Sequence, residues 1–270
     1  MKLLQSLSRP AAVSCLAVVM SLSVALAQDK AFEPQVGQAG KDVIWVPTPQ
    51  ALVDKMMEMA KVTPSDTVYD LGSGDGRTVI TAAKLGATAM GIEYNPDMVE
   101  LSKRNAAKEG VGDKANFMKA DLFETDFSQA TVVTMFLLPD INLRLRPKIL
   151  DMKPGTRIVS NTFDMGDWTP DEVAQAVDGC TSYCKANFWI VPAKVAGTWK
   201  LPQGELKLEQ KYQMITGTLR NGSTTAPIAN GKMNGDQISF TAGNNQYSGK
   251  VNGSTMEGGI TTATWKATRG

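Results

Sequence analysis

The chain has 270 residues, 43% of them hydrophobic, and a formal net charge of +1. It is long enough to bury one good core and a smaller second one, and its near-zero charge gives no basic field for nucleic-acid binding. It contains no histidine, which excludes a histidine general base, a Ser–His–Asp triad and a histidine-ligated metal, so no metal site is expected.

The first 27 residues have the pattern of an export signal. Lys2 and Arg9 are followed by an apolar run over Ala11–Ala27 that ends in Ala-Leu-Ala, a small-residue cleavage pattern. The sequence therefore predicts a signal peptide over residues 1–27, a mature start at Gln28 and an exported, periplasmic protein. The alternative is an uncleaved anchor in the inner membrane, which would keep the chain close to the membrane. The positive-inside rule places the remainder of the chain outside the cytoplasm.

Strands and helices are expected to alternate from Pro49 to Asn161, and a later strand is expected at Phe188–Val191. Residues 28–47 form a polar lead, interpreted as a loop that closes over the site, and Thr48 is a good N-cap for a helix over Pro49–Ala60. Alternation of this kind is typical of a parallel sheet covered on both faces. The expected strands are Val68–Leu71, Ala87–Glu93, Ala115–Lys119, Val132–Phe136, Arg157–Asn161 and Phe188–Val191, and the further helices are Arg77–Leu85, Pro96–Glu109 and Ile141–Leu150.

A glycine-rich loop follows the first of these strands. Its glycines, Gly72, Gly74 and Gly76, are spaced G-x-G-x-G, whereas a dinucleotide site needs G-x-G-x-x-G to pack its helix beneath a pyrophosphate. Glycines in such a loop let the backbone pass close to a ligand. The spacing indicates a nucleotide-type cofactor other than a dinucleotide.

Acidic residues around this loop indicate which cofactor it binds. Asp70 and Asp75 flank the loop, where carboxylates would repel a pyrophosphate at a helix N-terminus. They suit a ligand with a sulfonium and an ammonium group, which is S-adenosylmethionine. Glu93 ends the second strand about twenty residues on, where a carboxylate can hydrogen-bond a ribose diol.

These residues carry a family resemblance. The segment D-L-G-S-G-D-G-R at Asp70–Arg77 resembles motif I of the class I (seven-strand) S-adenosylmethionine-dependent methyltransferases, and Glu93 and Ala120–Leu122 match their ribose and adenine positions. V-P-T-P, F-L-L-P, L-R-P-K, P-G-T-R-I-V-S and D-W-T-P, within Val46–Pro170, are similar to the ATP-synthase c-subunit type lysine methyltransferases and their bacterial relatives. The resemblance implies an α/β fold, with a Rossmann-like seven-strand methyltransferase sheet over residues 48–194.

The resemblance also implies the roles of the cofactor-binding residues. The carboxylate of Glu93 takes the ribose hydroxyls, and Tyr94 packs on adenine. Asp121, with the amide of Leu122, reads the adenine edge; a helix N-cap or turn is the alternative for Asp121. The methionine part is expected to be lined by Gly72, Gly74 and Gly76, with Asp70 and Asp75 near its ammonium group.

The methyl acceptor is expected after the fourth and fifth strands. Phe136–Pro139 is apolar where amine methyltransferases of other branches carry D-P-P-Y or N-P-P-Y, which favours an aliphatic amine, such as a lysine in an apolar peptide, over a planar nucleobase. Candidate acceptor residues are Phe136, Leu138, Pro139, Asn161, Phe163, Asp164 and Trp168. Of these, Asp164 would orient the amine. Trp168 would contact a methylammonium group, or would instead form a hydrophobic corner. No catalytic acid or base is assigned, because transfer from a sulfonium needs mainly alignment and desolvation.

The last third of the chain differs in composition. Residues 195–270 are rich in Gly, Thr, Asn and Ser, and short alternating runs lie between Asn-Gly and Gly-Gly turns. This pattern predicts a small C-terminal all-β domain, a meander of five to seven strands folded as a sandwich or open barrel, with a packing or docking role. Just before it, Cys180 and Cys184 are expected either to form a small-loop disulfide or to remain as two buried thiols.

The sequence thus predicts an S-adenosylmethionine-dependent methyltransferase that acts on a protein lysine or another amine. The alternatives are a small-molecule or lipid methyltransferase and a non-catalytic exported binding protein that keeps the fold. Export conflicts with the cytoplasmic synthesis of S-adenosylmethionine. Three alternatives would resolve the conflict: the cofactor is available outside, an anchored domain faces inward, or the site has lost its ligand. The sequence gives no oligomeric state.

Overall fold

The structure, a computed structural model, describes residues 32–175, 178–202, 204–260 and 263–270. The predicted signal peptide over residues 1–27 lies outside the described residues, as does the start of the polar lead. Within the described ranges, no helix has the length and apolar character needed to cross a membrane.

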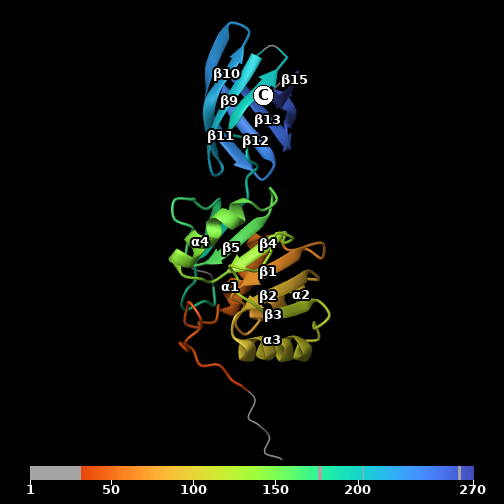
Figure 1. Cartoon of the computed structure of the whole chain (residues 1–270), viewed down its shortest axis with the longest axis vertical. Coiled ribbons are helices and arrows are strands. Elements are labelled where there is room, and N and C mark those ends of the chain that lie inside the picture. Colours follow the sequence, from red (N-terminus) through yellow and green to blue (C-terminus); the bar gives the residue numbers. More distant parts are fainter. Residues whose placement is uncertain (1–31, 176–177, 203, 261–262) are drawn as a thin grey trace, which may run out of the picture. The chain divides into compact units, whose positions relative to one another are not determined.

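The region from Thr67 to Ile190 contains a seven-stranded sheet with the order β3-β2-β1-β4-β5-β7-β6, of which Figure 1 labels β1 to β5. The strands from β3 to β5 pair in parallel, and β7 is antiparallel to both of its neighbours. The strands are β1 (Thr67–Leu71), β2 (Thr88–Glu93), β3 (Ala115–Lys119), β4 (Val132–Met135), β5 (Arg157–Asn161), β6 (Glu172–Ala174) and β7 (Ala186–Ile190).

Two hydrophobic clusters lie on the two faces of this sheet. Adjacent residues of one strand point to opposite faces, and accordingly Ile158 belongs to one cluster and Val159 to the other. The cluster with Val159 includes side chains of α1 (Gln50–Met59), α2 (Arg77–Lys84) and α3 (Pro96–Lys108), and the cluster with Ile158 includes those of α4 (Pro139–Leu150). Helices therefore cover both faces of the sheet, as the alternating pattern predicted.

Two local predictions in this region differ from the structure. Strand β6 was not predicted, because it has only three residues and two of them are exposed. Thr48 is not the N-cap of α1: Pro49 holds that position without a side-chain hydrogen bond. The Thr48 hydroxyl instead accepts a hydrogen bond of 3.2 Å from the Asn161 side-chain amide, so Thr48 ties the lead to the end of β5.

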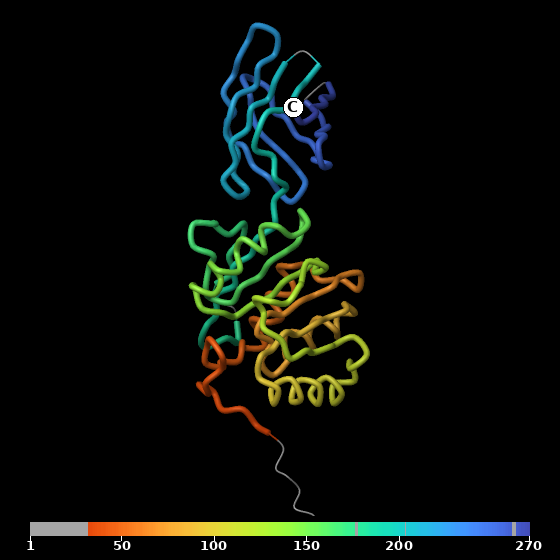
Figure 2. Tube along the Cα trace, viewed as in Figure 1, coloured from red at the N-terminus to blue at the C-terminus, as the bar shows by residue number. Residues whose placement is uncertain are grey.

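The C-terminal region, cyan to blue in Figure 2, is a closed, antiparallel barrel of eight strands; β8 pairs with both β9 and β15. The expectation of five to seven strands in a sandwich or open barrel was therefore wrong. The strands are β8 (Gly197–Leu201), β9 (Gly204–Lys211), β10 (Met214–Asn221), β11 (Thr224–Asn234), β12 (Gln237–Ala242), β13 (Asn245–Asn252), β14 (Thr255–Ile260) and β15 (Ala263–Arg269).

Glycine bulges help to explain why this sheet closes. The pairing of β10 with β11 shifts register between Ile215 and Thr218, where β11 has the extra residue, and a Cβ atom at Gly231 in this part of β11 would lie 2.3 Å from the carbonyl oxygen of Ile215. Bulges of this kind bend a strand and increase its twist, which curls a sheet. The interior is filled by side chains that include Trp199, Phe240 and Trp265, so the barrel has its own hydrophobic core.

Candidate active site

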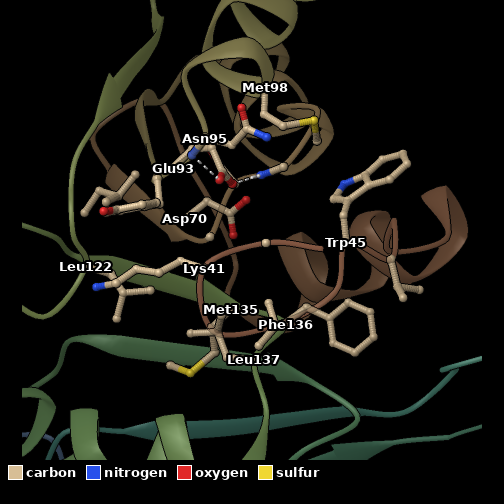
Figure 3. Close-up of a pocket in the computed structure, with 18 of the residues that line it drawn as sticks. Lys41, Trp45, Asp70, Glu93, Asn95, Met98, Leu122, Met135, Phe136 and Leu137 are labelled. Atoms are coloured by element: carbon tan, nitrogen blue, oxygen red, sulfur yellow. Dashed lines mark hydrogen bonds between the residues drawn. The ribbon is translucent and has the colours of Figure 1, made fainter. Parts of the chain in front are cut away.

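A pocket lies beyond the carboxyl ends of β1, β2 and β4, where ligands bind in open α/β sheets. Asp70 and Glu93 project into it on one side, and the ends of β4 and the lead segment form other walls (Figure 3). The segments that line it are Gln38–Thr48, Gly72–Asp75, Glu93–Asn95, Ala120–Leu122 and Met135–Leu137. The lead therefore lies over the site, as predicted.

The glycine loop has backbone angles that favour glycine. Gly74 has φ +54°, and a Cβ atom there would lie 2.6 Å from the indole nitrogen of Trp45. Gly76 has φ +84° and precedes α2, and a Cβ atom there would lie 2.8 Å from the Phe117 ring. Gly72 and Gly74 line the pocket but Gly76 does not. The predicted ligand contact of Gly76 is therefore not seen; this glycine lets the helix approach the sheet.

Glu93 is held in place by the loop that it faces. One carboxylate oxygen accepts a hydrogen bond of 2.9 Å from the Gly74 backbone amide, and the other accepts one of 2.9 Å from the Asn95 amide. The Asn95 side chain in turn accepts from Asp97 N–H and caps α3. The carboxylate at the end of β2 thus has a fixed orientation at the pocket wall, and each oxygen retains a lone pair for a ligand hydroxyl.

Asp70 is a buried carboxyl at the floor of the pocket. Its side chain accepts a hydrogen bond of 2.7 Å from the Thr134 hydroxyl. The pKa of Asp70 is raised to about 7: burial is the main cause and the nearby negative charges of Glu93 and Asp75 add to it, while hydrogen bonds from Thr134 and Thr78 oppose the shift. In the described part of the chain, no salt bridge involves Asp70. Such a group fits a ligand that brings its own positive charge.

Asp75 has a charged partner within the protein. It lines the pocket, but its carboxylate pairs with the Arg77 guanidinium at 2.6 Å. Arg77 also donates a hydrogen bond of 2.9 Å to the backbone oxygen of Thr48. The charge of Asp75 is therefore already compensated, and the pair fastens the lead to the start of α2, which leaves Asp70 as the better site for an ammonium group.

The adenine side of the pocket is bridged by Lys41. Its ammonium group pairs with Asp121 and lies 4.9 Å from the centroid of the Tyr94 ring. Asp121 also accepts a hydrogen bond of 2.9 Å from Phe123 N–H, so it stabilises a turn and lines the pocket at once. The hydrogen bond from Lys41 lowers the pKa of Asp121. Tyr94 and Leu122 line the same side.

Of the predicted acceptor residues, only Phe136 lines the pocket. Leu138 and Pro139 begin α4, and Leu138 is half-exposed. Asn161 is buried and holds Thr48, as described above. The exposed Asp164 accepts a hydrogen bond of 3.0 Å from Gly166 N–H and so forms a local turn. These residues lie outside the lining of the cofactor pocket, and their contacts with the acceptor stay predictions.

Trp168 forms a hydrophobic corner. Its side chain is fully buried, and its ring centroid lies 6.0 Å from that of Trp189 and 5.8 Å from that of Tyr212. Its backbone oxygen accepts a hydrogen bond of 2.8 Å from the Trp189 indole. A ring that is covered in this way cannot meet a substrate methylammonium group, so the predicted cation–π contact was wrong and the alternative is confirmed.

The sequence left the state of the two cysteines open and missed two residues of the pocket. Cys180 and Cys184 are joined by a disulfide, with 5.7 Å between their Cα atoms. Lys41 and Trp45 line the pocket, yet sequence reasoning named neither; the only signal was the expectation that residues 28–47 close over the site. Among the described residues, no group of three or more acidic or cysteine side chains could hold a metal ion.

Comparisons with known proteins agree with this geometry. The ANTKMT methyltransferase domain matches residues 70–172. A protein-lysine N-methyltransferase of Saccharolobus islandicus (strain REY15A) is 48% identical over 51% of this chain and 87% of that protein. The ATP synthase c-subunit lysine N-methyltransferase of Homo sapiens is 36% identical over 53% of this chain and 62% of that protein.

A solved structure is similar over the same share of the chain. The RNA methyltransferase from Salinibacter ruber, crystallised with S-adenosyl-L-homocysteine, is 45% identical, with a TM-score of 0.52 over 56% of this chain and 96% of that one. These matches cover about half of the chain, and the matched domain ends before the barrel. With the buried Asp70, the fixed Glu93 and the glycine loop in one pocket, the chain belongs to the ANTKMT-type family of S-adenosylmethionine-dependent methyltransferases.

Proposed function

We propose that the chain methylates the side-chain amine of lysine in a protein substrate. The observation that carries the proposal is the apolar wall at the end of β4, where Met135 and Leu137 are buried and Phe136 is half-buried beside the cofactor pocket. The relatives named for protein-lysine and ATP synthase c-subunit lysine methylation support the same acceptor.

The cofactor-binding residues would act by position and charge. S-adenosylmethionine supplies a methyl group that is activated by a sulfonium. Asp70 would hold the ammonium group of the cofactor, because the buried carboxyl gains a cation that offsets its desolvation. Glu93 would accept from the ribose hydroxyls, and Tyr94 would pack on adenine beside Asp121 and Leu122. Gly72 and Gly74 let the backbone approach the ligand.

The acceptor side would prepare the amine without a histidine. An apolar environment lowers the pKa of a lysine ammonium group because burial disfavours its charged form. Phe136 and Leu137 would thereby favour the neutral amine, which is the nucleophile, and would exclude water. Alignment of this amine with the methyl group is then the main contribution of the protein.

A transfer assay separates this proposal from its competitors. Purified protein, tritiated S-adenosylmethionine and a cell extract are incubated, and the labelled material is treated with protease or ribonuclease and then hydrolysed. We expect protease-sensitive label that elutes as methylated lysine. Ribonuclease-sensitive label would contradict the proposal and favour the RNA class named for the Salinibacter ruber structure, while label in lipid or small molecules would favour the other alternative of the sequence analysis.

We further propose that the protein is exported to the periplasm. The signal-peptide pattern of residues 1–27 supports this, as does the disulfide, because disulfides persist mainly in oxidising compartments. Fractionation and mass spectrometry of the native protein should find it outside the cytoplasm, starting at Gln28, with Cys180 and Cys184 protected from alkylation. A cytoplasmic protein that retains Met1 and has two free thiols would contradict export.

A further inference from the structure

Three aromatic rings lie against one another at the end of β4, and one of them, that of Phe136, lines the pocket. The centroid of the Phe136 ring lies 5.2 Å from that of Tyr183, in an edge-on arrangement with an interplanar angle of 61°. The Phe163 ring is stacked on the Phe136 ring, with 6.1 Å between the ring centroids and an interplanar angle of 21°. Because Phe136 itself lines the pocket, these three rings, here called the aromatic slot, are continuous with the cofactor site.

Phe163 is fixed to the sheet through its neighbours. Its backbone oxygen accepts a hydrogen bond of 2.6 Å from the Ser160 hydroxyl. The preceding amide, of Thr162, donates a hydrogen bond of 2.7 Å to the backbone oxygen of Lys185. This bond joins the segment after β5 to the residue that follows Cys184, so the disulfide loop is attached beside Phe163.

Tyr183 is held in a backbone conformation that its side chain disfavours. Its φ is +52°, in the left-handed region, which bulky residues adopt only where the surrounding structure enforces it. The disulfide between Cys180 and Cys184 encloses it within a five-residue loop. Its side chain is 44% exposed, so burial in a core does not explain the placement. Residues held in such a backbone conformation cluster at active sites and ligand clamps.

We propose that Tyr183 is a specificity-determining residue of the aromatic slot, and that the disulfide loop positions it to receive the methylene chain and ammonium head of a lysine. The proposal rests on lysine being the acceptor. Aromatic faces attract ammonium and methylammonium groups, and the attraction is stronger when the cation is partly desolvated. The slot would therefore accept mono- and dimethyllysine as well as lysine, and would favour more than one round of transfer.

Two substitutions at Tyr183 separate the ring from the backbone. Tyr183→Asn removes the ring, and asparagine tolerates positive φ, so the loop need not change. Tyr183→Phe retains the ring and serves as the matched control. The probes are three synthetic peptide libraries with randomised flanks around one central residue, which is lysine, monomethyllysine or dimethyllysine. Methyl transfer is measured by mass spectrometry, and S-adenosylmethionine binding by calorimetry.

We expect Tyr183→Asn to lower kcat/KM about five- to tenfold, mainly through KM, with the largest loss on the dimethyllysine library. Tyr183→Phe should remain within about twofold of the wild type, and both variants should bind S-adenosylmethionine as the wild type does. A double Cys180→Ser and Cys184→Ser variant should change KM in the same direction as Tyr183→Asn, because the loop would no longer hold the ring.

The outcomes distinguish the slot from the activity on which it rests. If the wild type methylates the libraries and Tyr183→Asn does so equally well, the slot is overturned while lysine methylation stands. If Tyr183→Asn weakens cofactor binding as much as transfer, Tyr183 is a structural residue and the proposal is wrong. A wild type that transfers methyl groups to protein in extract at residues other than lysine, and to none of the libraries, overturns both.

Discussion

The sheet region and the barrel differ in how their strands are buried. All four residues of β4, Val132–Met135, are buried, as expected for a central parallel strand that is covered on both faces. In the barrel, residues of β9 alternate between the interior and the outside over Gly204–Lys211. Because the strands from β3 to β5 are parallel, their carboxyl ends lie together at one edge, where loops gather into a pocket. The barrel strands are antiparallel and are joined by tight turns.

This difference explains where the chemistry lies. Every residue around the cofactor pocket comes from the lead or from the sheet region. The barrel has a core of its own, and it contributes contacts to the sheet region, such as a hydrogen bond of 2.7 Å from the Tyr212 hydroxyl to Asp167. We therefore expect substitutions in the sheet region to change ligand binding, and those in the barrel to change stability or substrate docking.

The largest effect is expected at the glycine loop. Gly74→Val should abolish S-adenosylmethionine binding, because φ +54° is strained for valine and its side chain would meet Trp45. The barrel offers a matched control in Gly253→Val, at φ +58° and with no atom within 4 Å of the added Cβ. Calorimetry should show binding only in the control, with circular dichroism showing both folded. Normal affinity in Gly74→Val would mean that this loop does not touch the cofactor.

Glu93→Ala should have the next largest effect. It removes hydrogen bonds to the ribose hydroxyls and to the Gly74 and Asn95 amides, and hydrogen bonds to charged groups contribute about 1.5–3 kcal/mol. The dissociation constant for S-adenosylmethionine should rise accordingly, by roughly ten- to 150-fold. Glu93→Gln keeps the size and should lose less. If the dissociation constant for S-adenosylmethionine changed less than threefold in Glu93→Ala, the assignment of Glu93 to the cofactor site would be wrong.

Because the pKa of Asp70 is raised, the affinity for S-adenosylmethionine should depend on pH, by at most about tenfold per pH unit. Its pKa is raised to about 7, so below pH 7 the carboxyl must release a proton before it can pair with the cofactor ammonium group. S-adenosylmethionine affinity should therefore increase as the pH rises towards 7 and then level off. Asp70→Asn should bind more weakly and lose this dependence, which calorimetry across pH 5–8 would reveal.

The raised pKa of Asp70 should also make the stability of the unliganded protein depend on pH, with the opposite sign. A carboxyl whose pKa is higher in the folded than in the unfolded state stabilises the fold at low pH, and this contribution is lost as the pH rises from about 4 to about 7. The difference in unfolding free energy between wild type and Asp70→Asn should shift across that range. A difference that is independent of pH would contradict the raised pKa.

Removal of the barrel should affect cofactor affinity least. We predict that the sheet region and the barrel separate near Ala193–Gly197, so that a protein ending at Val195 still binds S-adenosylmethionine, because the pocket residues all precede that point. Its melting temperature should fall, because Trp168 loses the Tyr212 ring that covers it. If the truncated protein binds the cofactor but no longer methylates the extract, the barrel docks the substrate. Loss of cofactor binding in a folded truncated protein would contradict the predicted division.

The sequence predicted those parts of the site that depend on local backbone geometry. The spacing of Gly72 and Gly74 and the positions of Asp70 and Glu93 at strand ends follow from chain order, and all four line the pocket. Lys41 meets Asp121 across eighty positions of sequence, and no local pattern reports such a contact. The sequence left two alternatives for Trp168, because the ring that stacks on it, that of Tyr212, follows 44 positions later in the barrel. Closure of the barrel was missed because it depends on the pairing of β8 with β15, the first and last strands.

The most direct test of the cofactor assignment is calorimetry of residues 28–270 with S-adenosylmethionine, S-adenosylhomocysteine and NAD. We expect one site of micromolar affinity for S-adenosylmethionine and for its demethylated product, and no binding of NAD. Binding of NAD without detectable binding of S-adenosylmethionine would contradict it.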